Sequence, residues 1–182
     1  MTKSITGKAS QGFSQRPSGK ENDGGKRMRL FEEMERRFEI KDARYFNKLL
    51  VDSDSIVRTR AVCILAEIAG EDAVKPIGEV LLEDDNALVR HEAAFSLGQL
   101  GLSSGIAPLE DAVRKDPSFF VRHEAAVALG VIGSESARET LLYALDKDES
   151  EEVRESAQVA LANLDYIKAT HSKSKFIKMT GG

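Results

Sequence analysis

The chain has 182 residues, of which 41% are apolar, and this is enough for one domain with a continuous core if the apolar residues are patterned. It has no run of 18 or more apolar residues, and no apolar stretch follows the positive charges near its start, so we expect neither a membrane span nor a signal peptide. The ends carry net charges of +3 (residues 1–26) and +4 (residues 167–182), which leaves −11 for the body out of a total of −4, a surface that favours cationic partners over nucleic acid.

The two basic ends are predicted to be disordered tails, because they lack the apolar residues needed to offset the entropy lost on ordering. These tails could still contact RNA or an acidic protein. Residues 27–166 between them are predicted to form one domain. Its first element is an amphipathic helix of about residues 27–38, which we expect to cap the N-terminal end of the domain.

From about residue 41 to residue 166 the chain repeats itself every 32 residues without a gap. Each unit has a second helix that opens with Val-Arg and carries Ala and Leu at fixed later positions. The four Val-Arg pairs are Val57-Arg58, Val89-Arg90, Val121-Arg122 and Val153-Arg154. A strict period of this length is typical of stacked helix pairs. The sequence therefore predicts an all-α fold, an α-solenoid of four HEAT-like helix pairs plus the capping helix.

Within each unit the spacing and the punctuation are helical. The apolar residues of the second helix fall at i, i+4, i+8 and i+11, inside an arc of about 80° that marks the core side. Asp116 is predicted to cap one of these helices, with Pro117 at its first position. Glycines follow the last apolar residue of three second helices, namely Gly70, Gly101 and Gly133.

The two central units carry a His-Glu doublet that the stack does not require. The doublets are His91-Glu92 and His123-Glu124, where the outer units have Thr59-Arg60 and Glu155-Ser156. On a helical wheel His91 lies about 200° from Val89, away from the core stripe and on the side of Ala94 and Gly98. Small residues there let neighbouring helices pack closely, and the doublets themselves are also compatible with loosely constrained, exposed positions.

A metal site is the sharper interpretation of the doublets. Equivalent helices of neighbouring repeats lie about 8–10 Å apart, so two imidazoles on one face could reach one ion. Two histidines with one carboxylate are typical of non-heme Fe(II) sites, whereas a closed zinc site favours cysteine. His91 and His123 are therefore candidate metal ligands, with Glu92 and Glu124 as carboxylates that ligate directly or orient an imidazole. The same ligands would accept manganese or zinc.

Three other features receive structural interpretations. The repeated arginines follow loops that contain aspartate, which predicts a ladder of ion pairs along the stack. Phe119 and Phe120 precede the second doublet, where one could staple the helix start and the other could line a pocket, but core packing is the favoured prediction. Cys63, in the segment VCILAEIA, is interpreted as a small buried hydrophobe.

The stretch NALVRHEAAFSLGQLGLSSGIAPLEDAVRKDPSFFVRHEAAVALGVIG resembles one half of deoxyhypusine hydroxylase, a HEAT-repeat iron enzyme in which each of two similar halves carries two His-Glu motifs. The resemblance covers about residues 50–166. It implies a di-iron centre between halves and hydroxylation of the deoxyhypusine side chain of translation initiation factor 5A. It also implies that His91, His123 and Glu124 ligate Fe(II) and that Glu92 is the catalytic carboxylate near the substrate.

The family's catalytic unit has four His-Glu motifs and this chain has two. The resemblance therefore leads us to expect a cytoplasmic iron monooxygenase that works as a homodimer, with the histidine faces of two chains opposed and translation initiation factor 5A as the substrate. Two alternatives stay open. One is a non-catalytic HEAT-repeat scaffold for protein partners. The other is a protein that handles a bilin chromophore, since the repeats also resemble those of phycobilin lyases.

Overall fold

A computed structural model describes residues 23–170, and these form nine α-helices and two short 3-10 helices, with no strand in that range. The prediction of an all-α solenoid is confirmed. The helices are α1 Asp23–Glu39, α2 Ala43–Leu49, α3 Ser55–Ala69, α4 Glu71–Glu83, α5 Ala87–Leu100, α6 Ile106–Lys115, α7 Phe119–Ile132, α8 Arg138–Lys147 and α9 Glu151–Thr170, with 3-10 turns η1 Ser103–Gly105 and η2 Glu135–Ala137.

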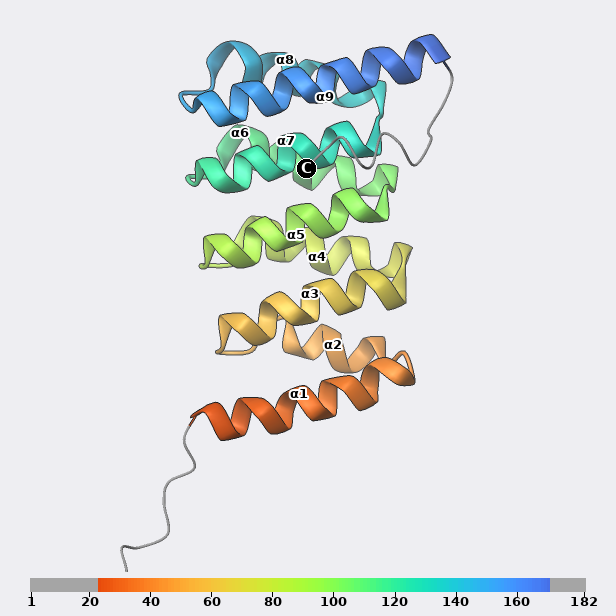
Figure 1. Cartoon of the computed structure of the whole chain (residues 1–182), viewed down its shortest axis with the longest axis vertical. Coiled ribbons are helices and arrows are strands. Elements are labelled where there is room, and N and C mark those ends of the chain that lie inside the picture. The colour runs from red at the N-terminus through yellow and green to blue at the C-terminus, as the bar shows by residue number, and fades with distance from the viewer. Residues whose placement is uncertain (1–22, 171–182) are drawn as a thin grey trace, which may run out of the picture.

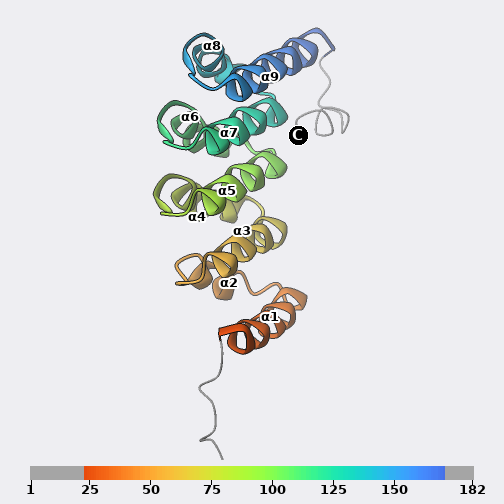
Figure 2. The same cartoon turned by 60° about the vertical axis from the view of Figure 1, so that its left-hand side comes forward.

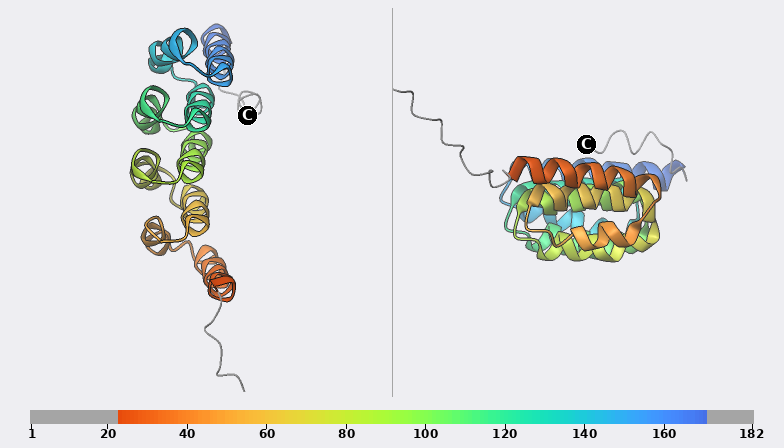
Figure 3. Two further views of the ribbon diagram at one scale, coloured as in Figure 1. Left: turned by 90° about the vertical axis from the view of Figure 1, so that its left-hand side faces the viewer. Right: turned by 90° about the horizontal axis from the view of Figure 1, so that it is seen from below.

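The helices pair as α2/α3, α4/α5, α6/α7 and α8/α9, and the pairs stack in one direction (Figures 1 and 2). We call α2, α4, α6 and α8 the outer row and α3, α5, α7 and α9 the inner row. Both rows bend in one shallow arc with the inner row on its concave side, as the left view of Figure 3 shows. The solenoid therefore presents one long concave surface made of second helices.

Helix α1 extends the inner row at the N-terminal end and has no first helix of its own (Figures 1 and 3). Met34 is buried, and Leu30 and Phe31 pack against the core cluster. The helix begins at Asp23, four residues before the expected start, and α9 runs to Thr170, four residues past the expected end of the domain. The rest of the two predicted tails, residues 1–22 and 171–182, lies outside the described residues.

The core follows the predicted stripe. In α5, Val89, Ala93 and Leu97 are at most 1% exposed, and the equivalent residues of α3, α7 and α9 are buried as well. Gly101 and Gly133 end α5 and α7 with φ of 68° and 66°, a left-handed conformation that only glycine adopts without strain. The predicted glycine stops are therefore confirmed at these helices.

The predicted start of α7 was wrong by two residues. The helix begins at Phe119 after Ser118, and Pro117 lies before it. Asp116 does not cap the helix, because its carboxylate accepts hydrogen bonds from Ser118 N and from the Arg90 side chain of the preceding repeat. A long-range ion pair thus takes the carboxylate that local spacing assigned to a cap.

Among residues 23–170, no helix is both long enough and apolar enough to cross a lipid bilayer.

Candidate functional site on the inner row

The doublets lie on the surface of the inner row that faces away from the outer row. Four positions of each second helix, spaced i, i+3, i+4 and i+7, share this side because helical neighbours recur every three to four residues. We call these positions the inner face. They are Ile56, Thr59, Arg60 and Cys63 in α3; Leu88, His91, Glu92 and Phe95 in α5; Phe120, His123, Glu124 and Val127 in α7; and Glu152, Glu155, Ser156 and Val159 in α9.

Close packing of the second helices brings the doublets of adjacent repeats together. A Cβ added to Gly98 of α5 would lie 2.9 Å from Ala128 Cβ of α7, and one added to Gly130 of α7 would lie 2.7 Å from Ala160 Cβ of α9. These glycines therefore have the packing role that the sequence indicated. The short distance between helix axes lets polar side chains on the same face touch across the gap.

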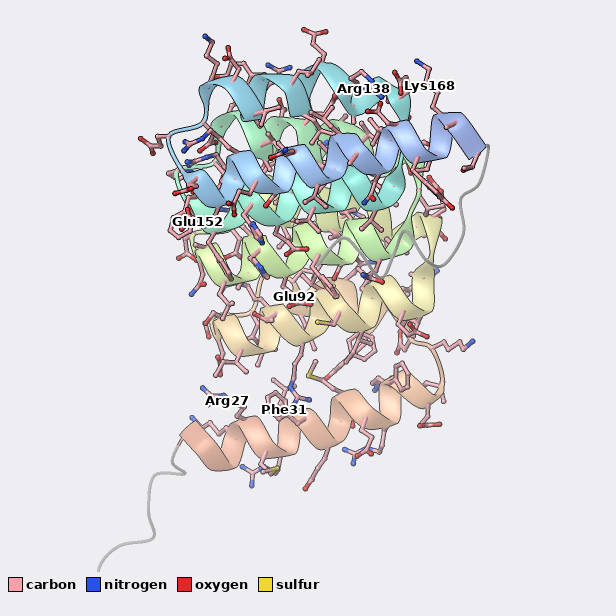
Figure 4. The ribbon with its side chains drawn as sticks, turned by 45° about the horizontal axis from the view of Figure 1, so that its top comes forward. Arg27, Phe31, Glu92, Arg138, Glu152 and Lys168 are labelled. Carbon is pink, nitrogen blue, oxygen red and sulfur yellow. The ribbon has the colours of Figure 1, made fainter. Side chains whose placement is uncertain are left out.

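Each junction within the inner row carries one such polar contact. His91 Nε2 lies 3.3 Å from Glu124 Oε2 between α5 and α7. His123 Nδ1 lies 2.6 Å from Ser156 Oγ between α7 and α9. At the third junction Cys63 Sγ lies 3.0 Å from Glu92 Oε1, and Glu92 points from α5 toward α3 (Figure 4). The four candidate ligands thus divide among three junctions, and only His91 and Glu124 are in direct contact.

His91 is held in one orientation by its surroundings. Its ring stacks on Phe120 with centroids 3.9 Å apart and planes 6° from parallel, while its Nε2 faces Glu124. The other ring nitrogen, Nδ1, is buried and has no hydrogen-bond partner among the described residues. Leaving a buried polar atom unpaired costs about 1–3 kcal/mol. An unpaired buried polar atom calls for an explanation, and a role in binding is one of the explanations that fit a histidine on this face.

Ser156 fixes the proton on the ring of His123. The serine hydroxyl donates to the Glu152 carbonyl oxygen at 2.6 Å, so the same oxygen is an acceptor toward His123. Nδ1 of His123 is then the protonated nitrogen and Nε2 carries the free lone pair. A histidine that donates one N–H to an oxygen partner and offers its second nitrogen is the usual form of a metal-ligating imidazole.

Glu92 is engaged with a thiol. Desolvation and the hydrogen bond to the Glu92 carboxylate raise the pKa of Cys63 to about 12, so the sulfur stays protonated and donates to Glu92. Cys63 is exposed on the inner face, and the interpretation of this residue as a buried hydrophobe was wrong. Its neighbour Val62, one position earlier, is the residue that enters the core.

Phe119 and Phe120 differ from the favoured prediction of core packing. They are 49% and 39% exposed, so neither belongs to the core. Phe120 occupies the inner face one turn before His123 and contacts His91 of the preceding repeat. Ile56 and Leu88 hold the position equivalent to Phe120 in the 32-residue repeat, and both are exposed too. Comparing the repeats therefore places Phe120 outside the core.

Fe(II) sites of the facial type need three protein ligands. Two histidines and two carboxylates along α5 and α7 have the right donor chemistry. However, among residues 23–170 no group of three or more His, Cys, Asp or Glu side chains converges closely enough to hold a metal ion. One chain alone therefore does not fit a complete iron centre, and it provides ligand pairs instead of full sets.

The arginine column is structural, as predicted. The first three arginines each donate through Nε and Nη2 to the aspartate of the next repeat and through Nη1 to a carbonyl oxygen of their own loop, whereas Arg154 donates to carbonyl oxygens of its own loop. The pairs are Arg58–Asp84, Arg90–Asp116 and Arg122–Asp148, with Nε–Oδ2 distances of 2.7 Å each. Both partners are largely buried in all three pairs. This arginine ladder sets the spacing of the repeats and thereby places the doublets in register.

Comparison with known proteins supports the HEAT-repeat fold. The family model of HEAT repeats matches residues 44–130 and 75–162. No curated protein sequence matches the chain. Human deoxyhypusine hydroxylase, whose structure is known in complex with glycerol, is similar at 32% sequence identity and a TM-score of 0.64. The similarity covers 72% of this chain and 46% of that one, so this chain spans about half the length of the human enzyme.

The two family matches overlap and together include all four helix pairs and both His-Glu doublets. The 32-residue period, the paired helices and the arginine ladder agree with that assignment. The chain belongs to the HEAT-repeat family.

Proposed function

We propose that this protein is an iron-dependent monooxygenase similar to deoxyhypusine hydroxylase and that it acts as a homodimer on the deoxyhypusine side chain of translation initiation factor 5A. The observation that carries the proposal is the pair of His-Glu doublets on adjacent inner helices, with His91 and Glu124 in contact. The 32% identity to the human enzyme over 72% of this chain supports it. The cytoplasm is the compartment in which such a substrate would be met.

In this proposal His91, His123 and Glu124 ligate Fe(II), and two chains together hold a di-iron centre. The orientation of the two imidazoles supports these roles, because Phe120 holds His91 and Ser156 keeps the Nε2 lone pair of His123 free. Bound Fe(II) would supply the redox chemistry with O2 that insertion of a hydroxyl group into a C–H bond needs. A second chain is required because one chain offers ligands in pairs.

Glu92 is proposed to act on the substrate as the catalytic carboxylate. Deoxyhypusine is an extended cationic amine, and a carboxylate on the inner face would hold its ammonium group by a charge-assisted hydrogen bond. The negative body of the chain would draw a cationic side chain toward this surface. Leu88 and Phe95 flank Glu92 on the same helix and are 56% and 43% exposed. These apolar side chains could pack against the aliphatic part of the deoxyhypusine side chain.

Metal analysis coupled to a mass measurement tests the proposal. After anaerobic loading with Fe(II) and desalting, we expect one iron per chain and a dimeric mass. His91→Ala and His123→Ala should each lower bound iron by about tenfold or more at unchanged helicity, while Thr59→Ala, the equivalent position in the first repeat, should bind as the wild type does. Full iron in both histidine variants would refute the ligand assignment.

Activity separates the substrate from the metal. With iron loaded, the dimer and O2 should convert the deoxyhypusine form of translation initiation factor 5A to the hydroxylated form, read as the gain of one oxygen in the mass of the factor. Glu92→Gln should abolish this gain and retain iron. Iron binding without turnover would leave a metal protein whose substrate is something else.

A non-catalytic scaffold is the second candidate. It is favoured by the absence of a three-ligand group within residues 23–170 and by the exposed apolar residues of the inner face. Concave solenoid surfaces commonly bind protein partners without a metal. An iron-free monomer after anaerobic loading would support this candidate over the first.

A further inference from the structure

The inner face is a polar strip between two apolar strips. The polar strip holds the His-Glu doublets and their equivalents in the outer repeats. On one side of it Ile56, Leu88 and Phe120 are 39–56% exposed, and on the other side Phe95 and Val159 are 43% and 48% exposed. Among the described residues no further layer of helices covers this surface, as the view along the stack in Figure 3 shows. Exposed apolar patches of this kind mark interaction surfaces.

Charge differs between the two ends of the polar strip. Arg60, in the first repeat, is exposed and stacks over the ring of Phe31 from α1 at 4.2 Å. Glu155, in the fourth repeat, is an exposed carboxylate, and Glu152, which holds the position of Ile56 in the neighbouring strip, is exposed as well. The strip is therefore positive at one end and negative at the other. A surface with this polarity is complementary to a copy of itself turned end for end.

We infer that a second copy of this chain covers the inner face with its order of repeats reversed, so that α3 of one copy lies against α9 of the other and α5 lies against α7. The inference rests on the proposed function, which supplies the second copy. The two-fold axis of this dimer runs parallel to the inner helices and passes between α5 and α7. A two-fold contact uses the same surface of both partners, as this arrangement does.

The reversed order sets opposite charges against each other at the ends of the polar strip and apolar residues against each other at the centre of the inner face. Arg60 of one copy meets Glu155 of the other, and Leu88 faces Phe120 across the interface. The alternative two-fold axis runs along the stack and places each repeat against its own counterpart. Arg60 would then meet Arg60, and Glu155 would meet Glu155. Like charges facing each other across an interface are strongly unfavourable, so the charges select the reversed order.

The reversed order also completes the ligand sets. His91 and Glu92 of one copy lie opposite His123 and Glu124 of the other. The two-fold axis generates a second, equivalent set from the remaining doublets. Because the inner row is concave, the end repeats of the two copies meet first and the central repeats keep a space between them (Figure 3). The doublets would line this enclosed space, and the contacts that close it would come from the first and fourth repeats.

A disulfide cross-link reads the order of repeats without any metal. Cys63 is the one cysteine of the chain and is exposed on the inner face, where the reversed order places it opposite Val159 of the other copy. In Val159→Cys the two thiols should join when diamide takes up their two electrons and two protons, giving a covalent dimer on a non-reducing gel. In Ile56→Cys, which faces Cys63 only in the alternative arrangement, cross-linking should be absent. Cys63→Ser combined with Val159→Cys should stay uncross-linked.

Charge exchange provides an independent measurement. By sedimentation equilibrium, Arg60→Glu and Glu155→Arg should each raise the dissociation constant of the dimer about tenfold or more, and the double variant should return close to the wild type. Arg44→Glu and Glu139→Arg, exposed on the outer row, are the matched controls and should have no effect. Glu155→Arg leaves the contact between Arg60 and Phe31 intact, so its effect cannot come from a displaced α1.

These outcomes separate the inference from the proposed function. A monomer in solution, a cross-link in Ile56→Cys instead of Val159→Cys, or no recovery in the charge-exchanged double variant would overturn the reversed dimer. A dimer with the predicted cross-link and recovery that binds no iron would establish the arrangement and refute the proposed function.

Discussion

The arginine ladder and the inner face are two parallel series of contacts on the same helices, and they differ in regularity. The ladder repeats one contact three times with the same residue types, the same 26-residue separation and the same 2.7 Å distance. The inner face uses three different contacts at three equivalent junctions. Regular repetition is what stacking requires, whereas differences between equivalent positions need another reason. In a repeat protein, function is therefore best sought where the period is broken.

The largest effect should come from breaking the ladder. Arg90→Ala leaves the Asp116 carboxylate, which is 5% exposed, without its cation, and loss of one partner of a buried ion pair costs about 3–5 kcal/mol. Urea denaturation should show this loss. Arg154→Ala is the matched control, because the Arg154 side chain donates only to the carbonyl oxygens of Asp148 and Glu149. Its cost should be about 1 kcal/mol, and equal costs for the two variants would contradict the structural role of the ladder.

A smaller loss is expected where the inner helices approach each other. Gly98→Ala places a methyl group 2.9 Å from Ala128 Cβ and 3.0 Å from its Cα, and such overpacking costs about 1–3 kcal/mol. Gly78→Ala in the outer row meets only the Pro108 side chain at 3.2 Å and serves as the control. In thermal unfolding, the melting temperature of Gly98→Ala should be lower than that of Gly78→Ala. The opposite ranking would mean that α5 and α7 can move apart freely.

Acid should weaken the arginine ladder. Desolvation is the largest single influence on Asp84 and Asp148 and opposes their ionised form, but the hydrogen bonds from the arginine and from the backbone, together with the arginine charge, outweigh it and lower the pKa of both carboxyls. A lowered folded-state pKa adds stability above the unfolded value of about 4, and this stability is lost as the pH falls through the folded value. The free energy of unfolding should therefore fall below about pH 4. In Asp84→Asn the decline should be shallower, and an unchanged slope would exclude the ladder as its source.

The smallest effect concerns the thiol at the edge of the inner face. Glu92→Gln removes the carboxylate that contributes, after desolvation, to the raised pKa of Cys63. The thiolate is the reactive form, so iodoacetamide should modify Cys63 severalfold faster in this variant at pH 8. Glu67→Gln, at an exposed glutamate of the α3 helix itself, is the control. No change in rate would show that the contact with Glu92 does not form in solution.

The fold could be predicted from the sequence because its signals are local and repeated. The apolar stripe and the glycine stops are visible within one unit, and the 32-residue period is visible when units are compared. Stacking is the only way such units bury their apolar sides. The ladder could be predicted in kind, from arginine after an aspartate-containing loop. The partners within the ladder could not be predicted, because Arg90 pairs with Asp116 in the next loop and not with an aspartate of its own loop. The same ion pair explains why the start of α7 was predicted two residues too early.

The candidate site could be predicted in its residues but not in its contacts. A helical wheel places His91 and His123 on one face, but it cannot show how far adjacent helices are offset along their axes. That offset brings each histidine to the residue 33 positions later, Glu124 or Ser156, instead of bringing the two histidines together. The predictions for Cys63 and Phe120 failed for a related reason. In the sequence, an apolar residue on a mostly polar face cannot be told apart from an apolar residue of the core.

The equal links of the arginine ladder make the junctions of this solenoid interchangeable parts. A duplicated 32-residue segment could be inserted between two helix pairs. Its aspartate would pair with the arginine of the repeat before it, and its arginine would pair with the aspartate of the repeat after it. The stack would lengthen without a new kind of joint, while the inner face would gain whatever doublet the copied segment carries. Evolution or a protein engineer can therefore change the number and order of the histidines on one side of the molecule while the side that holds it together stays the same.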